Sequence, residues 1–182
     1  MPNMSSHMSV AKRVAEILKI DSKDFYKGNL FPDLHKDKRK SHYKIQGKIY
    51  EVPDIEFAKN NLDLNNPFNL GILTHLLLDK YYLEEYLTPR FKENVFDNCD
   101  VIYQDYDILN KKIIKHFKLN VKEIKKILID YDYIIDNNKL SFNINCLDID
   151  KEGKTIYLNE KEFIDFLENT SLKITNEIKK FI

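Results

Sequence analysis

His75 and Asp79 lie four residues apart in NLGILTHLLLDKYY, residues 69–82, within a run of leucines. Side chains four apart in a helix leave the same face, one turn apart, so this imidazole and this carboxylate would be neighbours. An ionised carboxylate is costly to bury unless a cation or hydrogen-bond donors compensate its charge. Two interpretations stay open: an Asp–His pair that satisfies itself locally, with the acid neutral or paired, or two ligands of a metal ion.

Three more residues of the same chemical types precede this pair. His7 stands in SSHMSVA, Asp33 follows a proline in GNLFPDL, and His42 lies in RKSHYK. Each has an ordinary explanation as well: a residue near the chain start, a turn residue after proline, and a solvated loop histidine. A set made of imidazoles and carboxylates suits zinc, manganese or iron. The predicted site, for one ion or for two with a bridging carboxylate, contains His7, Asp33, His42, His75 and Asp79.

Asp105 in DVIYQDYDILN is a further candidate, because it shares a helix face with apolar neighbours. A carboxylate there would complete the ligand set of a metal or orient a ligand histidine by a hydrogen bond. The alternative is a partly exposed acidic patch near a helix start, where the helix dipole favours negative charge. We expect Asp54 to serve a helix end, and His35 and His116 to lie at the surface.

The periodicity of apolar residues predicts a mainly α-helical chain. A short second helix should end near Gly28, since Pro32 follows, and residues 33–50 are polar enough for a functional loop. Leu140, Phe142 and Ile144 alternate with polar residues, which favours a small β-hairpin between residues 140 and 158. The expected helices cover residues 8–20, 22–27, 52–61, 67–87, 98–117 and 121–131, and a last helix opens at the capping pair Asn159 and Glu162.

These elements divide the chain into two predicted parts. Residues 1–120 would form a helical metal-binding domain, and residues 121–182 would add C-terminal helices and a short β-hairpin packed on it. The second part has no histidine, cysteine and carboxylate cluster with ligand spacing. We therefore expect the chemistry in the first part, with the second part covering a cleft or binding a partner.

Composition narrows the class of protein. The 182 residues are 43% hydrophobic and 32% charged, which suits one folded domain with a small appendage. Basic and acidic residues balance at 29 each, so no clear nucleic-acid-binding surface is expected. Cys99 and Cys146 match no metal or redox spacing and are expected to be free thiols. No signal peptide or membrane span is visible, which predicts a cytoplasmic protein.

The order of the motifs resembles the zinc-dependent phospholipase C and P1 nuclease superfamily. More closely, it resembles the short cytoplasmic bacterial branch labelled phospholipase C/D-like. The chain carries SSH, GNLFPD, KSH, VPD and LGILTHLLLD in that order, over residues 1 to about 117. The resemblance implies a mainly helical fold with ligands converging on a cleft. It implies histidine ligands at His7 and His75, a bridging carboxylate at Asp79, and a second ion held by Asp33 and His42.

The resemblance also implies a function: a metal-dependent phosphoesterase, with zinc expected first and manganese or iron as alternatives. Its substrate would be a phosphoester, and Asp33 would both bind metal and orient the attacking water. No histidine occurs between Asp79 and His116, so the third ion of the secreted enzymes is not expected. The alternative function is a noncatalytic, metal-stabilised binding module. HD-domain phosphohydrolases and HExxH proteases are disfavoured, because neither motif occurs.

Overall fold

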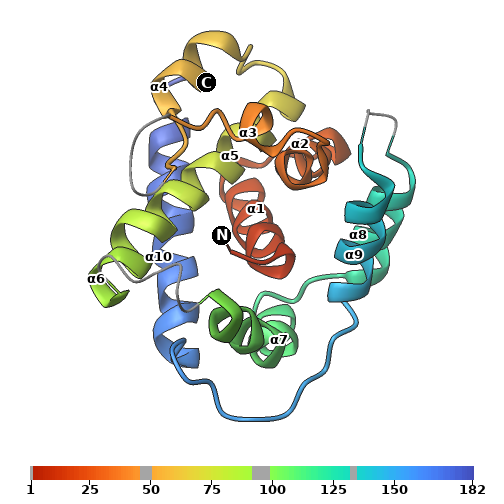
Figure 1. Cartoon of the computed structure of the whole chain (residues 1–182). Coiled ribbons are helices and arrows are strands. Elements are labelled where there is room, and N and C mark those ends of the chain that lie inside the picture. The colour runs from red at the N-terminus through yellow and green to blue at the C-terminus, as the bar shows by residue number, and fades with distance from the viewer. Residues whose placement is uncertain (1, 46–50, 92–98, 132–134) are drawn as a thin grey trace.

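The computed structural model describes residues 2–45, 51–91, 99–131 and 135–182, and its regular elements are helices (Figure 1). Within these ranges there is no strand, and isolated antiparallel bridges join His35 to Ile135 and Lys44 to Pro53. The prediction of a mainly α chain is confirmed. The elements are α1 (Met4–Leu18), α2 (Lys23–Leu34), α3 (Lys38–Ser41), α4 (Ile55–Asn61), α5 (Pro67–Tyr81), the π-helix η1 (Tyr82–Leu87), α6 (Thr88–Phe91), α7 (Cys99–His116), α8 (Val121–Ile129), α9 (Asn137–Cys146) and α10 (Glu160–Ile178).

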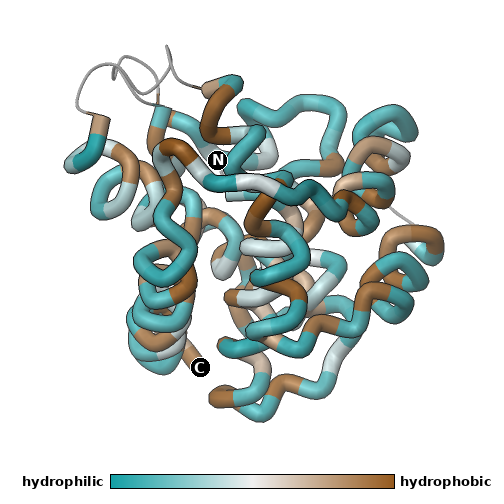
Figure 2. The backbone as a smooth tube through the Cα atoms, turned by 90° about the horizontal axis from the view of Figure 1, so that it is seen from below, coloured by the Kyte–Doolittle hydropathy of each residue, from teal (hydrophilic) through white to brown (hydrophobic). Residues whose placement is uncertain are grey.

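Helix α1 lies at the centre of the molecule, with α5 and α10 on one side, α7 below it and α8 and α9 opposite (Figure 1). It contacts α2, α5, α7 and α10. Its apolar residues Val10, Ala11 and Val14 are fully buried. Figure 2 shows apolar and polar segments alternating along the helices, the pattern of amphipathic helices that face a shared core. Helix α1 is therefore part of the core.

Two glycines bring the backbones of α2 and α5 into direct contact. A Cβ atom added to Gly28 would lie 1.8 Å from the carbonyl oxygen of Phe68, and one added to Gly71 would lie 2.0 Å from that of Phe25. Both distances are far below van der Waals contact, so only glycine permits this approach. The contact places the α2 backbone directly beside the helix that carries His75.

The expected end of the second helix at Gly28 is wrong. Helix α2 continues through Pro32 to Leu34. Gly28 serves the contact with α5 instead of a helix end. In the polar segment expected over residues 33–50, α2 covers residues 33 and 34 and α3 covers Lys38–Ser41. Residues 46–50 lie outside the described residues.

The β-hairpin expected between residues 140 and 158 is also wrong. Helix α9 covers Asn137–Cys146, and residues 147–159 connect it to α10 without a strand. Leu140 and Ile144, four residues apart, pack against the core, whereas Phe142 is 67% exposed. The four-residue spacing of Leu140 and Ile144, which is typical of a helix, therefore outweighed the short alternation of apolar and polar residues that favoured a strand. Asp136 strengthens the helix start by accepting hydrogen bonds from the first-turn N–H groups.

Two predicted helix starts are confirmed at the level of the hydrogen bond. The carboxylate of Asp54 accepts from the N–H of Phe57, and the side chain of Asn159 accepts from the N–H of Glu162. Across the described ranges, no helix combines the length and apolar character needed to cross a membrane. The division at residue 120 and the cytoplasmic location stay predictions.

Candidate metal centre

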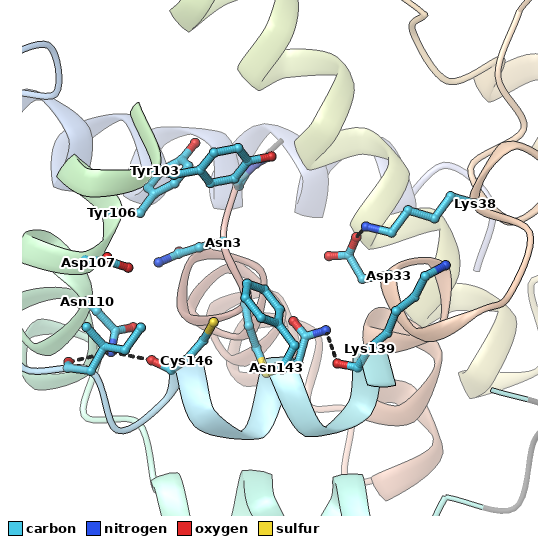
Figure 3. Close-up of a pocket in the computed structure, with 14 residues that line it drawn as sticks. Asn3, Asp33, Lys38, Tyr103, Tyr106, Asp107, Asn110, Lys139, Asn143 and Cys146 are labelled. Atoms are coloured by element: carbon cyan, nitrogen blue, oxygen red, sulfur yellow. Dashed lines mark hydrogen bonds and ion pairs between the residues drawn. The ribbon is translucent and has the colours of Figure 1, made fainter. Parts of the chain in front are cut away.

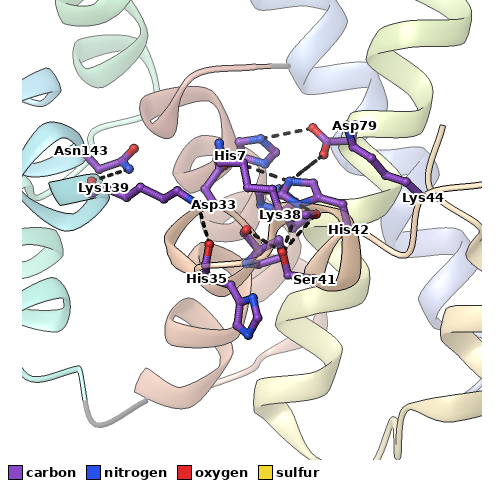
Figure 4. Close-up of polar contacts among 12 residues, drawn as sticks. His7, Asp33, His35, Lys38, Ser41, His42, Lys44, Asp79, Lys139 and Asn143 are labelled. Atoms are coloured by element: carbon purple, nitrogen blue, oxygen red, sulfur yellow. Dashed lines mark hydrogen bonds and ion pairs between the residues drawn. The ribbon is translucent and has the colours of Figure 1, made fainter. Parts of the chain in front are cut away.

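The five predicted ligands lie together, although they come from four separate segments. Figure 4 labels four of them: His7, Asp33, His42 and Asp79. The second turn of α1 supplies His7, and the end of α2 supplies Asp33. His42 follows α3 directly. Helix α5 supplies both His75 and Asp79 from one face. The close packing of α1, α2 and α5 is what makes this meeting possible.

Three imidazoles converge on the Asp79 carboxylate. The Nε2 atoms of His7 and His75 each lie 3.4 Å from one of its oxygens, and Nε2 of His42 lies 3.6 Å away. All four side chains are buried, with exposed fractions of 1% or less. Nε2 of His42 also lies 3.7 Å from the Asp33 carboxylate.

Two overlapping trios offer metal-ligand geometry within this cluster. One is His7, His75 and Asp79, and the other is Asp33, His42 and His75. In each trio the candidate ligand atoms lie within 4.8 Å of one another. The cluster therefore has donors for one ion or two.

Backbone carbonyls determine which nitrogen of two histidines faces the cluster. Nδ1 of His75 lies 2.7 Å from the carbonyl oxygen of Asn29, and Nδ1 of His42 lies 2.8 Å from that of Lys38. A carbonyl only accepts, so Nδ1 must carry the hydrogen and Nε2 keeps its lone pair when the ring is neutral. Metal-binding histidines commonly donate their other N–H in this way. The two Nε2 atoms lie 3.3 Å apart, where a shared cation or a proton relieves the repulsion between lone pairs.

The polar side-chain atoms of His7 and Asp79 have no hydrogen bond in the described part of the chain. These atoms are both ring nitrogens of His7 and both carboxylate oxygens of Asp79. Buried polar groups are nearly always paired, so such atoms require an explanation. The His7 ring stacks on His75 with centroids 3.7 Å apart. A divalent cation would bind one ring nitrogen of His7 and the oxygens of Asp79 and would balance the carboxylate, so the residues fit a metal ion.

The protonation states of the cluster residues favour cation binding. Burial and the neighbouring His75 lower the pKa of His7 to about 4, so this imidazole is neutral near pH 7. Burial would raise the pKa of Asp79, but His75 and His7 outweigh it and hold the pKa below its ordinary value. Burial also opposes ionisation of Asp33, and its neighbours His42, His75 and Lys38 again prevail. Both carboxylates are therefore anionic, the state that binds metal.

His75 shows the competition between a proton and a metal ion. Burial lowers its pKa, but Asp79 and Asp33 outweigh burial and raise it. A proton on His75 and a cation at the same place are alternative ways to balance two buried carboxylates.

The pocket that reaches this cluster has a volume of about 350 Å³ (Figure 3). Of the five ligand candidates, all of them described, Asp33 is the one that lines it. The Asp33 side chain is 15% exposed, in contrast to the closed surroundings of Asp79. A small molecule in the pocket therefore meets the cluster at Asp33.

Asp105 lies apart from the five ligand candidates and holds a loop instead. Its buried carboxylate accepts hydrogen bonds from the backbone N–H groups of Ile156, Tyr157 and Leu158, at 2.8, 2.6 and 2.8 Å. All three donors come from the connection between α9 and α10, which no local pattern placed next to α7. The structure thus gives Asp105 a role in anchoring this connection.

We expect Asp105→Asn to lower the free energy of unfolding by about 2–4 kcal/mol while leaving metal content unchanged. The amide has one acceptor oxygen, so its NH₂ group would face a buried backbone N–H. Thermal or urea unfolding measures the first effect, and elemental analysis measures the second. Asp107→Asn, on the same helix and without a hydrogen bond to the connection, serves as the control. Metal loss in Asp105→Asn with unchanged stability would contradict the anchoring role.

The other candidate histidines and both cysteines lie outside the five-residue cluster. His116 is 44% exposed and lies 3.2 Å from Glu168, as expected for a surface residue. The half-buried His35 accepts a hydrogen bond from the N–H of Asp37. Cys99 and Cys146 are half-buried and lie outside the two candidate ligand trios found among the described residues, and their expected state as thiols stays a prediction.

Sequence reasoning missed the backbone groups and glycines that orient the ligands. The carbonyl of Asn29 positions His75, and Gly71 allows α2 to come close enough to do so. In the sequence these residues could have been found at the GN of GNLFPD and the LG of LGILTHLLLD. No family model matches the chain, and no solved structure matches it. Function therefore has to be argued from the chemistry of the site.

Proposed function

We propose that this protein is a metal-dependent phosphoesterase with a His/Asp centre for one or two divalent ions. The observation that carries the proposal is the convergence of five predicted ligands next to a pocket. Zinc is the leading candidate and manganese or iron(II) are alternatives, because the donors are imidazole nitrogens and carboxylate oxygens. The motif order, which resembles zinc-dependent phospholipase C and P1 nuclease, supports the same chemistry.

The residues divide into a fully buried group and a group that borders the pocket through Asp33. His7, His75 and Asp79 would hold one ion in the buried part, and Asp33 with His42 would hold a second ion. When bound, such ions supply Lewis acidity toward a phosphoryl group and make water acidic near neutral pH.

In this proposal Asp33 acts on the reacting water, and the position of its carboxylate, which borders both the cluster and the pocket, supports that role. It would accept a hydrogen bond from the water and so aim the water oxygen at phosphorus. In the net reaction the water oxygen bonds to phosphorus, the ester P–O bond breaks, and the departing alkoxide oxygen takes up a proton. Asp33 is therefore our candidate catalytic residue.

The second candidate function is a noncatalytic module stabilised by metal. Full burial of His7, His75 and Asp79 favours it, because structural metal sites are closed, whereas catalytic sites keep an open position. Access through Asp33 to the pocket favours the enzyme.

We expect the purified protein to contain about one to two transition-metal ions per chain, as the two ligand trios would allow. Elemental analysis of protein prepared without chelators, followed by a panel of phosphomonoesters and phosphodiesters, tests this. If the chelated protein stays folded and loses hydrolysis that zinc restores, the enzyme proposal is supported. An unfolded apo form with no hydrolysis by the holo form would favour the noncatalytic module. Absence of bound metal even after incubation with zinc or manganese would overturn both functions.

A further inference from the structure

Two lysines line the same end of the pocket as Asp33 (Figure 3). Lys38 comes from α3, and its ammonium group lies 3.1 Å from the Asp33 carboxylate. Lys139 comes from the first turns of α9, which belongs to the C-terminal part where no chemistry was expected. The fold thus adds a cationic group from residue 139 to a site whose ligands end at residue 79.

Lys139 is held in place without being neutralised by a described neighbour. Its ammonium donates to the carbonyl oxygens of His35 and Lys36, at 2.7 and 3.2 Å (Figure 4 shows the first of these contacts). In the described ranges no carboxylate pairs with it, whereas Lys38 is paired with Asp33. Lys139 therefore brings an unbalanced positive charge to this end of the pocket.

The far end of the pocket has a different character. Asp107 lies there, opposite the two lysines in Figure 3. Phe142 and Ile149 add apolar surface to the lining of the pocket. The pocket is therefore polarised, with cationic groups beside the proposed metal centre and a carboxylate at the other end. A second anionic group on a ligand would be repelled by Asp107.

We infer that Lys38 and Lys139 form an anion subsite that selects phosphomonoester dianions carrying one phosphoryl group on a small, uncharged, apolar alcohol. This inference rests on the proposed function and names its substrate class. When Asp33 binds metal, the ion would balance its charge, so that the Lys38 ammonium as well as that of Lys139 could face a ligand. Two ammonium groups then match the two charges of a monoester phosphate, whereas a diester carries one charge. The apolar wall suits an aryl or short alkyl group, and Asp107 disfavours polyphosphates.

The test compares two non-hydrolysable probes by calorimetry on the zinc-loaded protein. Phenylphosphonate is a dianion at mildly alkaline pH, and its monomethyl ester is a monoanion with the same ring. We expect the wild-type protein to bind the dianion about tenfold more tightly, which corresponds to about 1.4 kcal/mol. Lys139→Met should weaken dianion binding about tenfold and leave the two probes within about twofold of each other.

Two further variants separate charge at the pocket from effects on folding. Lys139→Arg keeps the charge and should retain most of the preference for the dianion. Lys179→Met removes an exposed lysine after α10, near the C-terminus and away from the pocket, and should bind both probes like the wild type. Circular dichroism and zinc content should be unchanged in all three variants.

The outcomes distinguish this inference from the proposed function. Equal affinity of the wild type for both probes, no binding of either probe, or wild-type binding by Lys139→Met would overturn the subsite, even if phosphoesters are hydrolysed. Probe binding that depends on Lys139 would support the subsite even if no hydrolysis is found, and that absence would count against the proposed function alone.

Discussion

Asp79→Asn is expected to lower metal affinity at least about a hundredfold and to abolish phosphoester hydrolysis. Loss of a partner outside the ligand set already costs up to about a hundredfold in typical metal sites, so loss of a ligand should cost no less. Asparagine keeps the size of the side chain, but it removes the negative charge on which three imidazoles converge. Elemental analysis after gel filtration measures metal content, and a responsive substrate from the phosphoester panel measures turnover.

The control for Asp79→Asn is Asp165→Asn on α10. Asp165 is 53% exposed and pairs only with Lys161 among its described ion pairs, so its loss should change neither metal content nor turnover. Metal occupancy like that of the wild type in Asp79→Asn would show that the buried carboxylate is not a ligand. The cluster would then be an internally paired Asp–His network.

Gly71→Ala is expected to destabilise the fold by about 3 kcal/mol or more and to lower metal content in whatever protein remains folded. The new Cβ would lie 2.0 Å from the carbonyl oxygen of Phe25 and 2.7 Å from the backbone nitrogen of Asn29. These are backbone atoms, so no side-chain rotation relieves the clash, and α2 must move away from α5. That movement would separate the Asn29 carbonyl from Nδ1 of His75, which it now contacts at 2.7 Å.

Thermal unfolding without zinc measures the stability of Gly71→Ala. The change in melting temperature on adding zinc measures whether the folded protein still binds metal. Lys80→Ala, on the same helix but at its half-buried outer side, should stay within about 0.5 kcal/mol of the wild type. A Gly71→Ala protein with unchanged melting temperature and metal content would mean that α2 and α5 do not pack at backbone contact.

Local interactions explain what could be predicted from the residues alone. Helix periodicity and capping act over a few residues, so most helices and the starts at Asp54 and Asn159 were predictable. His75 and Asp79 share a helix face by spacing alone, and the other three ligand candidates were recognised by residue type and motif order. The failures were also local: a three-residue alternation at Leu140 competed with helical spacing, and Gly28 resembled a helix end.

The sequence by itself therefore determined the helical class and the set of candidate ligands, because both depend on residue type and short spacing. The tertiary structure decided which of those side chains meet. His7 reaches Asp79 because α1 packs against α5, and His75 finds the Asn29 carbonyl because two glycines admit α2. The carboxylate of Asp105 instead accepts hydrogen bonds from three N–H groups about fifty residues away in sequence. Such contacts join distant segments through close packing of whole helices, so the spacing of residues along the chain does not predict them.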